Sequence, residues 1–405
     1  MRCGCSEHAE IVRVPAQRAI RQLAEPSASK TRLILNIDFI ITELFVGGAE
    51  RCLTELAIGL TRRGDRVRVG SIGSLPTGDQ AQLTDRLVGE GIELFSAGCD
   101  HWSEAVRARA MLRDWLREGR PDVAQSMLVH ANIIGTMAAV AANVRVRVGG
   151  VRVAERSRVR NAIESWAMSR MSAVVCVSNS VRNFVHGAQR TNTPLHVVSN
   201  SIDLDQIEAT NSVSWGSVSP SLAGGSHDVL LFVGRLHPQK GLDVLFDALP
   251  ELLARHADMK VVLVGDGPLR AWVESTAATL SPERIAVVGW RRDALSLIKA
   301  CRLLVLPSRF EGMPNVVMEA MAAGKPIACT RVEGVEELLG SSMSNQTCEP
   351  GNVDALRELI NRLWEDPDRA NSLGAQNRSL IAASYSVDKM VRRYHELYQS
   401  LMDSL

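Results

Sequence analysis

Apolar residues recur along this chain in two alternating spacings. Residues 32–40 form a short, almost continuous apolar run, which has the length of a strand buried on both faces. Residues 49–64 instead place apolar side chains three and four positions apart, the spacing of one helix face, and end in a glycine. A second strand-like run follows at residues 65–73. This strand–helix–strand order predicts a parallel sheet covered by helices.

The alternation continues through the first half of the chain. Further strands are expected at residues 122–127, 145–151 and 173–178, and helices at residues 106–118, 131–142 and 162–171. Residues 1–30 differ, because they contain two prolines and no clear period. We therefore predict an N-terminal appendage at residues 1–30 and a Rossmann-like domain at residues 31–208.

A second series of strands and helices follows a break in the pattern. Residues 209–227 are rich in Ser, Gly and Pro and have no period, which predicts a linker. Strands are then expected at residues 228–236, 259–264, 284–290, 303–308 and 325–330, with helices at residues 241–256, 269–280, 293–303 and 315–324. The chain is predicted to be helical again from residue 353, with a break at Pro367. The fold class is thus α/β: two doubly wound Rossmann-like domains facing across a cleft, the second at residues 228–384.

The composition is that of an ordinary globular protein of two domains. A chain of 405 residues is longer than a domain with one compact core usually is. Of its residues, 46% are hydrophobic and 22% are charged, and the net charge is +1. These values disfavour a basic nucleic-acid binder and a disordered acidic chain. No apolar run reaches membrane-spanning length, and the N-terminus lacks the apolar stretch of a secretory signal. We expect a cytoplasmic protein.

Cysteine usage does not suggest a disulfide framework. Cys176, Cys301 and Cys329 lie in apolar surroundings and are interpreted as buried thiols of a reducing cytosol. Cys3 and Cys5 with His8 could hold a metal, but no second pair occurs at zinc spacing. A loose tail is favoured there, and neither a metal nor a cofactor is expected.

Positive charge is concentrated in the first half. Residues 1–205 hold 26 Lys+Arg against 21 Asp+Glu, and the remainder holds 20 against 24. Two arginine runs account for the excess: Arg107, Arg109, Arg113, Arg117 and Arg120, and then Arg145, Arg147, Arg152, Arg156, Arg158 and Arg160. Solvated faces are the favoured interpretation. The alternative is a patch that attracts an anionic acceptor or an anionic membrane surface.

Two glycine-containing turns are candidate phosphate sites. Gly47-Gly48-Ala49-Glu50 joins a strand to a helix, where glycine lets the backbone approach a ligand at the helix N-terminus. Gly234-Arg235 and Lys240 lie between another strand and helix. Two cations there oppose the helix dipole, which favours a bound pyrophosphate.

The sharpest pattern is a pair of glutamates around a helix start. Glu311 lies in the loop Ser308–Asn315, and Glu319 lies within the helix that follows. Glu319 is four residues after Asn315, so both side chains should lie on one side of the helix. A glutamate amid apolar helix residues would be costly to bury without a partner. The pair therefore predicts binding of one polyhydroxyl ligand, with a phosphate at the helix start between a sugar and a ribose.

His130 is a weaker candidate. It directly follows an apolar strand and precedes a helix. A structural role and a place in the site remain equal alternatives, because ligands of such sheets bind beyond the carboxyl ends of strands.

Taken together, the motifs resemble those of a known enzyme family. GRLHPQKG, VGDGP, VVGW and PSRFEGMPNVVMEAMAAGKPIACTRVEG are similar to the C-terminal motifs of the retaining glycosyltransferases of family 4, which have the two-domain GT-B fold. GGAE and HANIIGTMAA are similar to the acceptor-side elements of that family. The likeness covers roughly residues 31–400.

The resemblance implies a role for each motif residue. The second domain would bind a UDP- or GDP-linked hexose, and Arg235 and Lys240, after Gly234, would neutralise its diphosphate without a metal ion. The transferred sugar would be held by Glu311 and by the backbone amides of Gly312, Met313 and Pro314. The diphosphate would contact Asn315 and Val316, and the ribose would contact Glu319. His130 would lie beside the sugar, Gly47 and Gly48 would close over the donor, and residues 385–405 would form a helix crossing back to the first domain. His130, Glu311, Arg235 and Lys240 are the implied catalytic residues.

The implied reaction is transfer of the hexose, with retention of configuration, to a saccharide or lipid-linked acceptor. Peripheral contact with the inner face of the cytoplasmic membrane is an open alternative for the acceptor half, and no nucleic-acid partner is expected. Two motifs depart from the family: Asn200-Ser201-Ile202-Asp203 lacks its usual glycine, and Glu333 replaces a glycine before Gly334.

Two other functions remain open. The same cleft could bind a nucleotide sugar without turnover, or the chain could be a sugar epimerase of the same fold. A dehydrogenase is disfavoured, because Gly265-Asp266-Gly267 lacks the third glycine of a dinucleotide-binding turn. No P-loop, G-x-S-x-G or H-E-x-x-H motif occurs.

Overall fold

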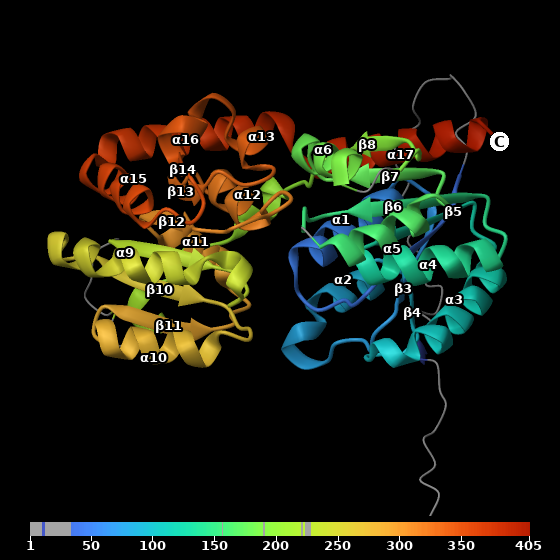
Figure 1. Cartoon of the computed structure of the whole chain (residues 1–405), viewed down its shortest axis with the longest axis horizontal. Coiled ribbons are helices and arrows are strands. Elements are labelled where there is room, and N and C mark those ends of the chain that lie inside the picture. The colour runs from blue at the N-terminus through green and yellow to red at the C-terminus, as the bar shows by residue number, and fades with distance from the viewer. Residues whose placement is uncertain (1–9, 13–33, 156, 189–190, 220–221, 223–227) are drawn as a thin grey trace, which may run out of the picture.

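Two sheets with mainly parallel strands, each covered by helices, follow one another along the chain (Figure 1). The computed structural model describes residues 10–12, 34–155, 157–188, 191–219, 222 and 228–405. The possible metal site at Cys3, Cys5 and His8, most of the predicted appendage, Arg156 and part of the predicted linker lie outside these residues. The prediction of an α/β fold with two doubly wound sheets is confirmed.

The first domain is built on eight strands in the order β1-β4-β3-β2-β5-β6-β7-β8. These strands are β1 (Glu10–Val12), β2 (Asn36–Ile41), β3 (Arg66–Ser71), β4 (Glu93–Ser96), β5 (Val123–Met127), β6 (Val146–Val151), β7 (Ala173–Cys176) and β8 (Leu195–Val197). Its helices are α1 (Gly48–Arg62), α2 (Gln82–Gly89), α3 (Ala105–Gly119), α4 (Val129–Ala141), α5 (Arg158–Met168) and α6 (Asn179–Ala188). The strand order reverses between β2 and β5, which places α1 and α4 at the switch point where such sheets bind ligands.

The second domain is built on six parallel strands in the order β11-β10-β9-β12-β13-β14. They are β9 (Val229–Val233), β10 (Lys260–Val264), β11 (Ile285–Gly289), β12 (Leu303–Leu306), β13 (Ile327–Thr330) and β14 (Thr347–Cys348). The helices are α9 (Leu242–Arg255), α10 (Arg270–Leu280), α11 (Ala294–Ala300), α12 (Asn315–Ala322), α13 (Val335–Leu339), α14 (Met343–Gln346), α15 (Val353–Glu365) and α16 (Pro367–Ser384). The order reverses between β9 and β12, so the two predicted donor motifs follow the two strands that flank this switch point.

Burial explains why the apolar runs are strands. Leu230, Leu231 and Phe232 of β9 are fully buried, as expected for a strand covered on both faces. All six described cysteines are unpaired and buried, which confirms the interpretation of Cys176, Cys301 and Cys329 as buried thiols. Burial raises the pKa of the Cys176 and Cys301 thiols to about 12, so both remain protonated.

Several elements differ from the predictions. Strand β1 pairs antiparallel with β4, although its residues lie within the predicted appendage. Helix α5 begins at Arg158, four residues before the expected start, because its polar first turn carries no apolar period. Helices α7 (Leu204–Ala209) and α8 (Trp215–Val218) lie in the connection between the domains, where Trp215 is buried. Helix α8 has only four residues, too few to show a periodic pattern.

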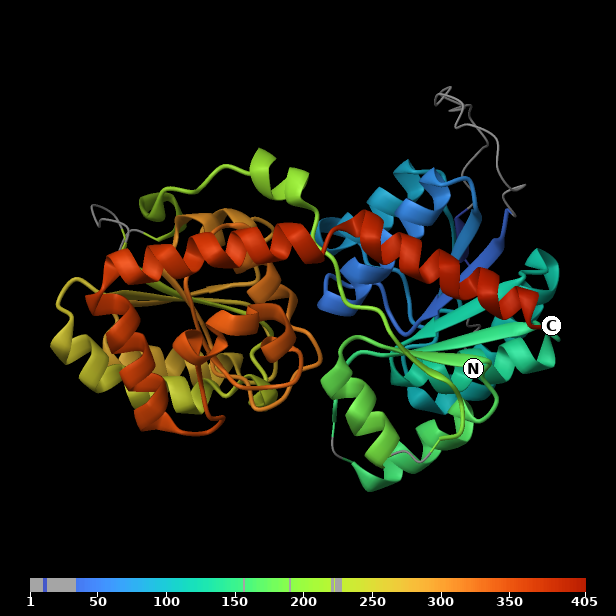
Figure 2. The ribbon, with the colours of Figure 1, turned by 90° about the horizontal axis from the view of Figure 1, so that it is seen from above.

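The C-terminal segment spans both domains. Helix α16 covers the second domain and α17 (Val387–Asp403) continues along the first (Figure 2). Met390 of α17 contacts Cys52 of α1, with 3.5 Å between the sulfur atoms, and the buried Tyr398 hydroxyl donates to Gln125 Oε1 at 3.0 Å. The end of the chain therefore packs into the core of the first domain.

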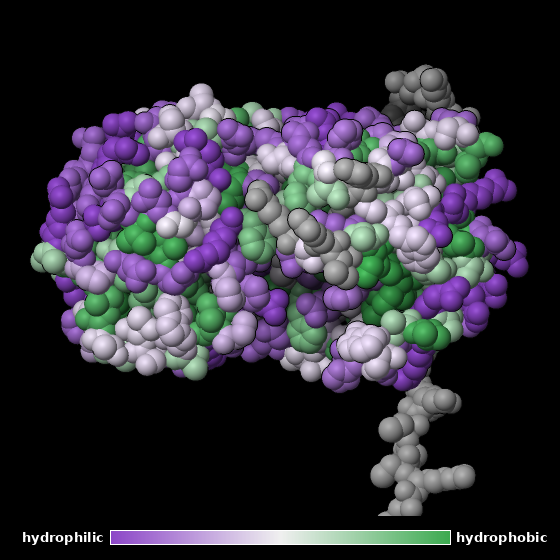
Figure 3. All heavy atoms as spheres, in the orientation of Figure 1, coloured by the Kyte–Doolittle hydropathy of each residue, from purple (hydrophilic) through white to green (hydrophobic). Residues whose placement is uncertain are grey.

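The molecular surface mixes hydrophilic and hydrophobic residues over both domains on the face shown in Figure 3. Within the described part of the chain, no helix has both the length and the apolar character needed to cross a bilayer.

Candidate functional site

Loops from both domains meet at the start of α12. The backbone N–H of Ala154, after β6, donates to the Glu311 carbonyl at 3.3 Å. Asn315, the first residue of α12, donates from Nδ2 to the Gly48 carbonyl of the first domain at 2.8 Å. The sequence-predicted loops after β2 and β12 are therefore in direct contact.

The loop before α1 is tightly packed. A Cβ atom on Gly47 would lie 2.3 Å from Glu50 Oε2, and one on Gly48 would lie 3.2 Å from Asn315 Nδ2. This neighbour is the end of the flexible Glu50 side chain, which can turn away, so the close approach does not by itself require glycine at position 47. Gly48 lies directly against the second domain.

Glu50 is an unusual carboxylic acid in this loop. It is buried, and the loss of hydration raises its pKa to about 7, with a smaller contribution from nearby Glu43. Arg152 acts in the opposite direction. Glu50 therefore holds a proton in the neutral range, beside the glycines that approach α12.

Glu311 is buried and held by two donors. Lys240 Nζ donates to Glu311 Oε1 at 2.6 Å, and Ser308 Oγ donates to the same oxygen at 2.7 Å. The backbone N–H of Glu311 donates to Glu333 Oε2 at 3.2 Å. Glu311 Oε2 has no hydrogen-bond partner within the described residues, so it can accept from a ligand hydroxyl.

Glu319 is paired across the domain boundary. Its Oε1 accepts from Arg51 Nη1 of α1 at 2.5 Å. Asn315 and Glu319, four residues apart, thus both reach α1, as their spacing predicts. The expectation that a buried glutamate here needs a partner is confirmed, and the partner is a residue that the sequence did not single out.

Asn200 connects the two domains at the same point. Its Nδ2 donates to the Met313 carbonyl at 3.1 Å and to Asn315 Oδ1 at 2.6 Å, and its Oδ1 accepts from Arg152 Nη2 at 2.6 Å. Asn200 and Arg152 are both buried. This chain of hydrogen bonds fixes the loop before α12 against the first domain.

At Gly312 the backbone of the second domain closely approaches that of the first. A Cβ atom on it would lie 1.8 Å from the Arg152 carbonyl oxygen, so any larger residue would push the domains apart. Pro314 caps α12 at its N-terminus. The expectation of a donor amide at Pro314 is wrong, because proline has no N–H. The first amides of α12, including those of Asn315 and Val316, have no partner within the helix and can bind an anion.

Arg235 provides positive charge directly after β9. It is exposed directly after Gly234, whose N–H donates to the Val264 carbonyl at 3.0 Å. Among the described residues, no carboxylate pairs with Arg235, and Lys240 follows on the same loop. The loop after β9 therefore offers one paired and one unpaired cation.

His130 is exposed in the first turn of α4, beyond the carboxyl end of β5. Leu128, the residue before α4, has φ 73°, a positive value that residues other than glycine rarely adopt. No hydrogen bond or ion pair links His130 to the residues around α12 within the described chain.

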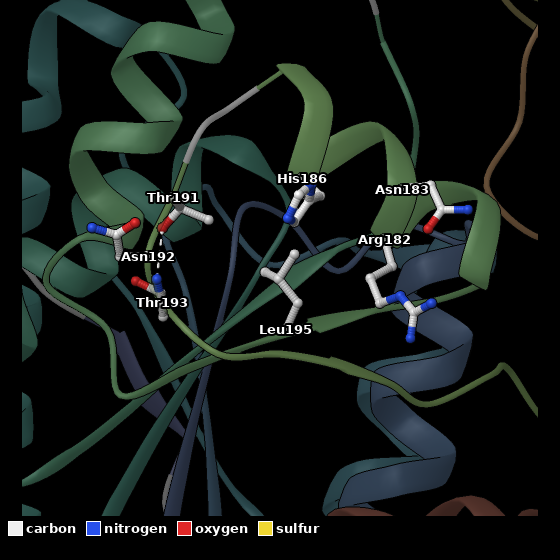
Figure 4. A pocket seen from close by; sticks show the side chains of 7 residues that line it. All are labelled: Arg182, Asn183, His186, Thr191, Asn192, Thr193 and Leu195. Carbon is white, nitrogen blue, oxygen red and sulfur yellow. Dashed lines mark hydrogen bonds between the residues drawn. The ribbon is translucent and has the colours of Figure 1, made fainter.

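Two further observations bear on ligand binding. In the residues that the structure describes, no three His, Cys, Asp or Glu side chains are placed to hold a metal ion. A hollow of about 520 Å³ lies between α6 and β8, lined by residues that include Arg182, His186 and Leu195 (Figure 4). None of the sequence-predicted residues lines it.

Sequence reasoning missed the roles of three residues. Arg51 gave no signal, because its partner is 268 positions away. Arg152 was one member of an arginine run, and Asn200 was noted only as part of a divergent motif. Their contacts depend on the packing of two domains, which no local spacing encodes.

The family comparisons agree with this arrangement. The sequence profile of Glycosyltransferase Family 4 matches residues 46–206, and that of Glycosyl transferases group 1 matches residues 227–366. The chain is 32% identical over 181 residues to an uncharacterised glycosyltransferase of Methanocaldococcus jannaschii, covering 44% of this chain and 50% of that protein. It is 28% identical over 176 residues to the alpha-D-kanosaminyltransferase of Streptomyces kanamyceticus, covering 42% and 46%. These alignments span about half the length of each relative.

A solved structure shows the same fold over most of the chain. The Anabaena protein Alr3699/HepE in complex with UDP-glucose superposes with a TM-score of 0.77 at 22% identity, covering 90% of this chain and 100% of that chain. With two profiles that together span both domains, the chain belongs to the family 4, group 1 glycosyltransferases and has their two-domain GT-B fold.

Proposed function

We propose that this chain is a retaining glycosyltransferase that moves a hexose from a nucleoside-diphosphate sugar to a saccharide or lipid-linked acceptor without a metal ion. The observation that carries the proposal is the convergence at the start of α12. A cation, a buried carboxylate with one available oxygen and a glycine loop of the other domain meet there: Lys240, Glu311 and Gly48. Family membership, and a structural neighbour that binds UDP-glucose, support the nucleotide-sugar donor.

The diphosphate would lie beside the loop after β9. Arg235 supplies an exposed guanidinium, Lys240 supplies an ammonium, and α12 directs its first amides at the same switch point. Negative charge grows on the diphosphate as the bond to the anomeric carbon breaks. Fixed donors that match this developing charge lower the barrier to reaction.

The transferred sugar and the ribose would bind on either side of this diphosphate. Glu311 Oε2 accepts from hydroxyls of the sugar, while Lys240 and Ser308 keep Oε1 in place. Glu319, one helical turn beyond Asn315, accepts from the ribose. A nucleotide sugar bound here would use both glutamates at once.

The first domain would supply the acceptor side and exclude water. His130, at the switch point between β2 and β5, would face the sugar, and the Gly47–Gly48 loop would cover the donor. Water exclusion protects the donor from hydrolysis. Retention of configuration rests on family membership.

A lipid-linked or anionic acceptor is supported by the surface at the start of α3. Trp102 and Val106 are 87% and 79% exposed there, and the exposed Arg109, one turn further along α3, has no acidic partner within the described residues. Exposed aromatic and basic side chains together are typical of peripheral contact with anionic membranes.

The test is sugar transfer by the purified chain from a panel of UDP- and GDP-hexoses, with an extract as acceptor source. We expect nucleotide release that depends on the acceptor, an unchanged rate in EDTA, and a product with the anomeric configuration of the donor. Lys240→Ala and Glu319→Ala should abolish transfer while each variant still melts cooperatively. Wild-type rates in both variants would refute the assignment. Nucleotide binding without any transfer would instead indicate a binding protein.

A further inference from the structure

The ion pair between Arg51 and Glu319 joins the two domains at the proposed ribose site. The guanidinium belongs to the first turn of α1 and the carboxylate to α12, with 2.5 Å between Nη1 and Oε1. The Glu319 side chain is only 12% exposed, whereas Arg51 is 38% exposed. It joins α1 of the first domain directly to α12 of the second, whereas the pair between Arg378 and Glu208 joins α16 to the connecting helix α7.

The other contacts between the domains are of a different kind. Asn315 and Gly48 join through an amide and a carbonyl, Asn179 donates to Glu337 from its backbone at 2.7 Å, and Gly312 packs against Arg152. None of these contacts uses a side-chain oxygen proposed to bind ribose. The Arg51 pair differs from these contacts because it engages a carboxylate that the substrate also needs.

We propose that Arg51 is a positioning residue that competes with the donor ribose for Glu319. The two hydroxyls of a ribose donate hydrogen bonds to the oxygens of the Glu319 carboxylate. Arg51 already donates to one of these oxygens, Oε1. The same ion pair holds α1 against α12. Nucleotide binding at Glu319 is therefore coupled to loosening of this contact between the domains. This inference rests on the proposed function, because it takes Glu319 as the ribose acceptor.

The energetic argument follows from the burial of the two groups. The Glu319 carboxylate has low exposure and is stabilised by its charge-assisted hydrogen bond to Arg51. When the ribose binds, its neutral hydroxyls must replace this cation as donors. Arg51 is partly exposed and can return to water at little cost. The ion pair therefore weakens nucleotide binding. The size of this effect depends mainly on the interaction that the Glu319 carboxylate loses when the ribose binds.

The structure offers a closely matched control. Arg86 of α2 pairs with Glu55 of α1 at 2.6 Å, with side-chain exposures of 35% and 15%. Both residues lie within the first domain, far from Glu319 in sequence. Arg86→Gln thus removes the same charge from a pair of similar exposure without touching the contact between the domains.

The experiment compares wild type, Arg51→Gln, Arg51→Lys and Arg86→Gln in two measurements. Small-angle X-ray scattering without added nucleotide gives the radius of gyration. Calorimetric titration with UDP and with GDP gives the affinity. We expect a larger radius of gyration for Arg51→Gln only, and roughly three- to tenfold tighter binding of the preferred nucleotide by that variant. Arg51→Lys, which keeps the charge, should remain close to wild type.

Each other outcome has a definite meaning. An unchanged radius of gyration for Arg51→Gln overturns the role of the ion pair in holding the domains. Unchanged affinity overturns the competition, and weaker affinity shows that Arg51 binds the nucleotide instead. A larger radius with no UDP or GDP binding by any variant leaves the ion pair supported and contradicts the proposed function.

Discussion

Gly312→Ala tests whether the two domains must meet as closely as the structure shows. The added Cβ atom would lie 1.8 Å from the Arg152 carbonyl oxygen and 3.1 Å from Val177 Cγ1, both in the first domain. Because carbon and oxygen do not approach within 3.0 Å in such contacts, the backbones must separate by about 1 Å. The hydrogen bond from Ala154 to Glu311 is already 3.3 Å long and would break.

The separation should affect catalysis more than folding. Displacing reacting groups by about 1 Å costs about 100-fold in rate, so kcat/KM for sugar transfer should fall by about that factor. The strain is relieved by moving one domain relative to the other, so the free energy of unfolding should fall by only about 1 kcal/mol, the value of one hydrogen bond.

The assay is donor-dependent transfer at saturating acceptor, with urea unfolding of the same samples. Gly89→Ala is the control, because a Cβ atom at this helix-end glycine has no neighbour within 4 Å. It should keep wild-type kcat/KM. The reasoning is refuted if Gly312→Ala also keeps wild-type kcat/KM. It is equally refuted if the variant loses several kcal/mol of stability, because the strain would then lie inside a domain.

Three further substitutions have distinct expected outcomes. Arg235→Ala removes an exposed cation that has no acidic partner among the described residues, so stability should change by less than about 0.5 kcal/mol. Nucleotide affinity should fall about tenfold by calorimetry, and an unchanged affinity would contradict the role of Arg235. Lys240→Ala leaves the buried Glu311 carboxylate without its cation, so urea unfolding should show a loss of about 1–3 kcal/mol, and wild-type stability would count against the pair. Glu50 has a pKa raised to about 7, so its contribution to stability is present below about pH 4.5 and lost as the pH rises through 7. Glu50→Gln should therefore gain stability relative to wild type by up to about 3 kcal/mol between pH 4.5 and 8, and a constant difference across that range would contradict the raised pKa.

The sequence predicts the fold well because the strands are buried on both faces. β9 and β12 appear as continuous apolar runs, and the motif residues between strand and helix follow directly from their position. The family resemblance of their motifs implied one site for Lys240 and Glu311, which are 71 residues apart, and the structure adds that both loops follow strands that flank a switch point.

Short or unevenly patterned elements escaped this reasoning. β1 has three residues, and α8 has four, so neither can show a period. The first turn of α5 contains polar residues and gives no apolar signal. In each case tertiary packing, rather than local pattern, selects the structure.

The contacts between the domains were beyond any local pattern. Arg51 follows the recognised glycines by only a few residues, but nothing near it indicates a carboxylate on α12. Asn200 and Arg152 likewise acquire their roles from a junction between distant segments. Paired buried charges can be expected from sequence, but the identity of the partner requires the packed domains.

A crystal structure of the chain with a UDP- or GDP-hexose tests the central claim most directly. We expect the diphosphate between Arg235, Lys240 and the first amides of α12, with the ribose on Glu319 and the sugar on Glu311. A nucleotide bound elsewhere, such as the hollow beside Arg182, or a diphosphate that touches neither cation, would contradict the account.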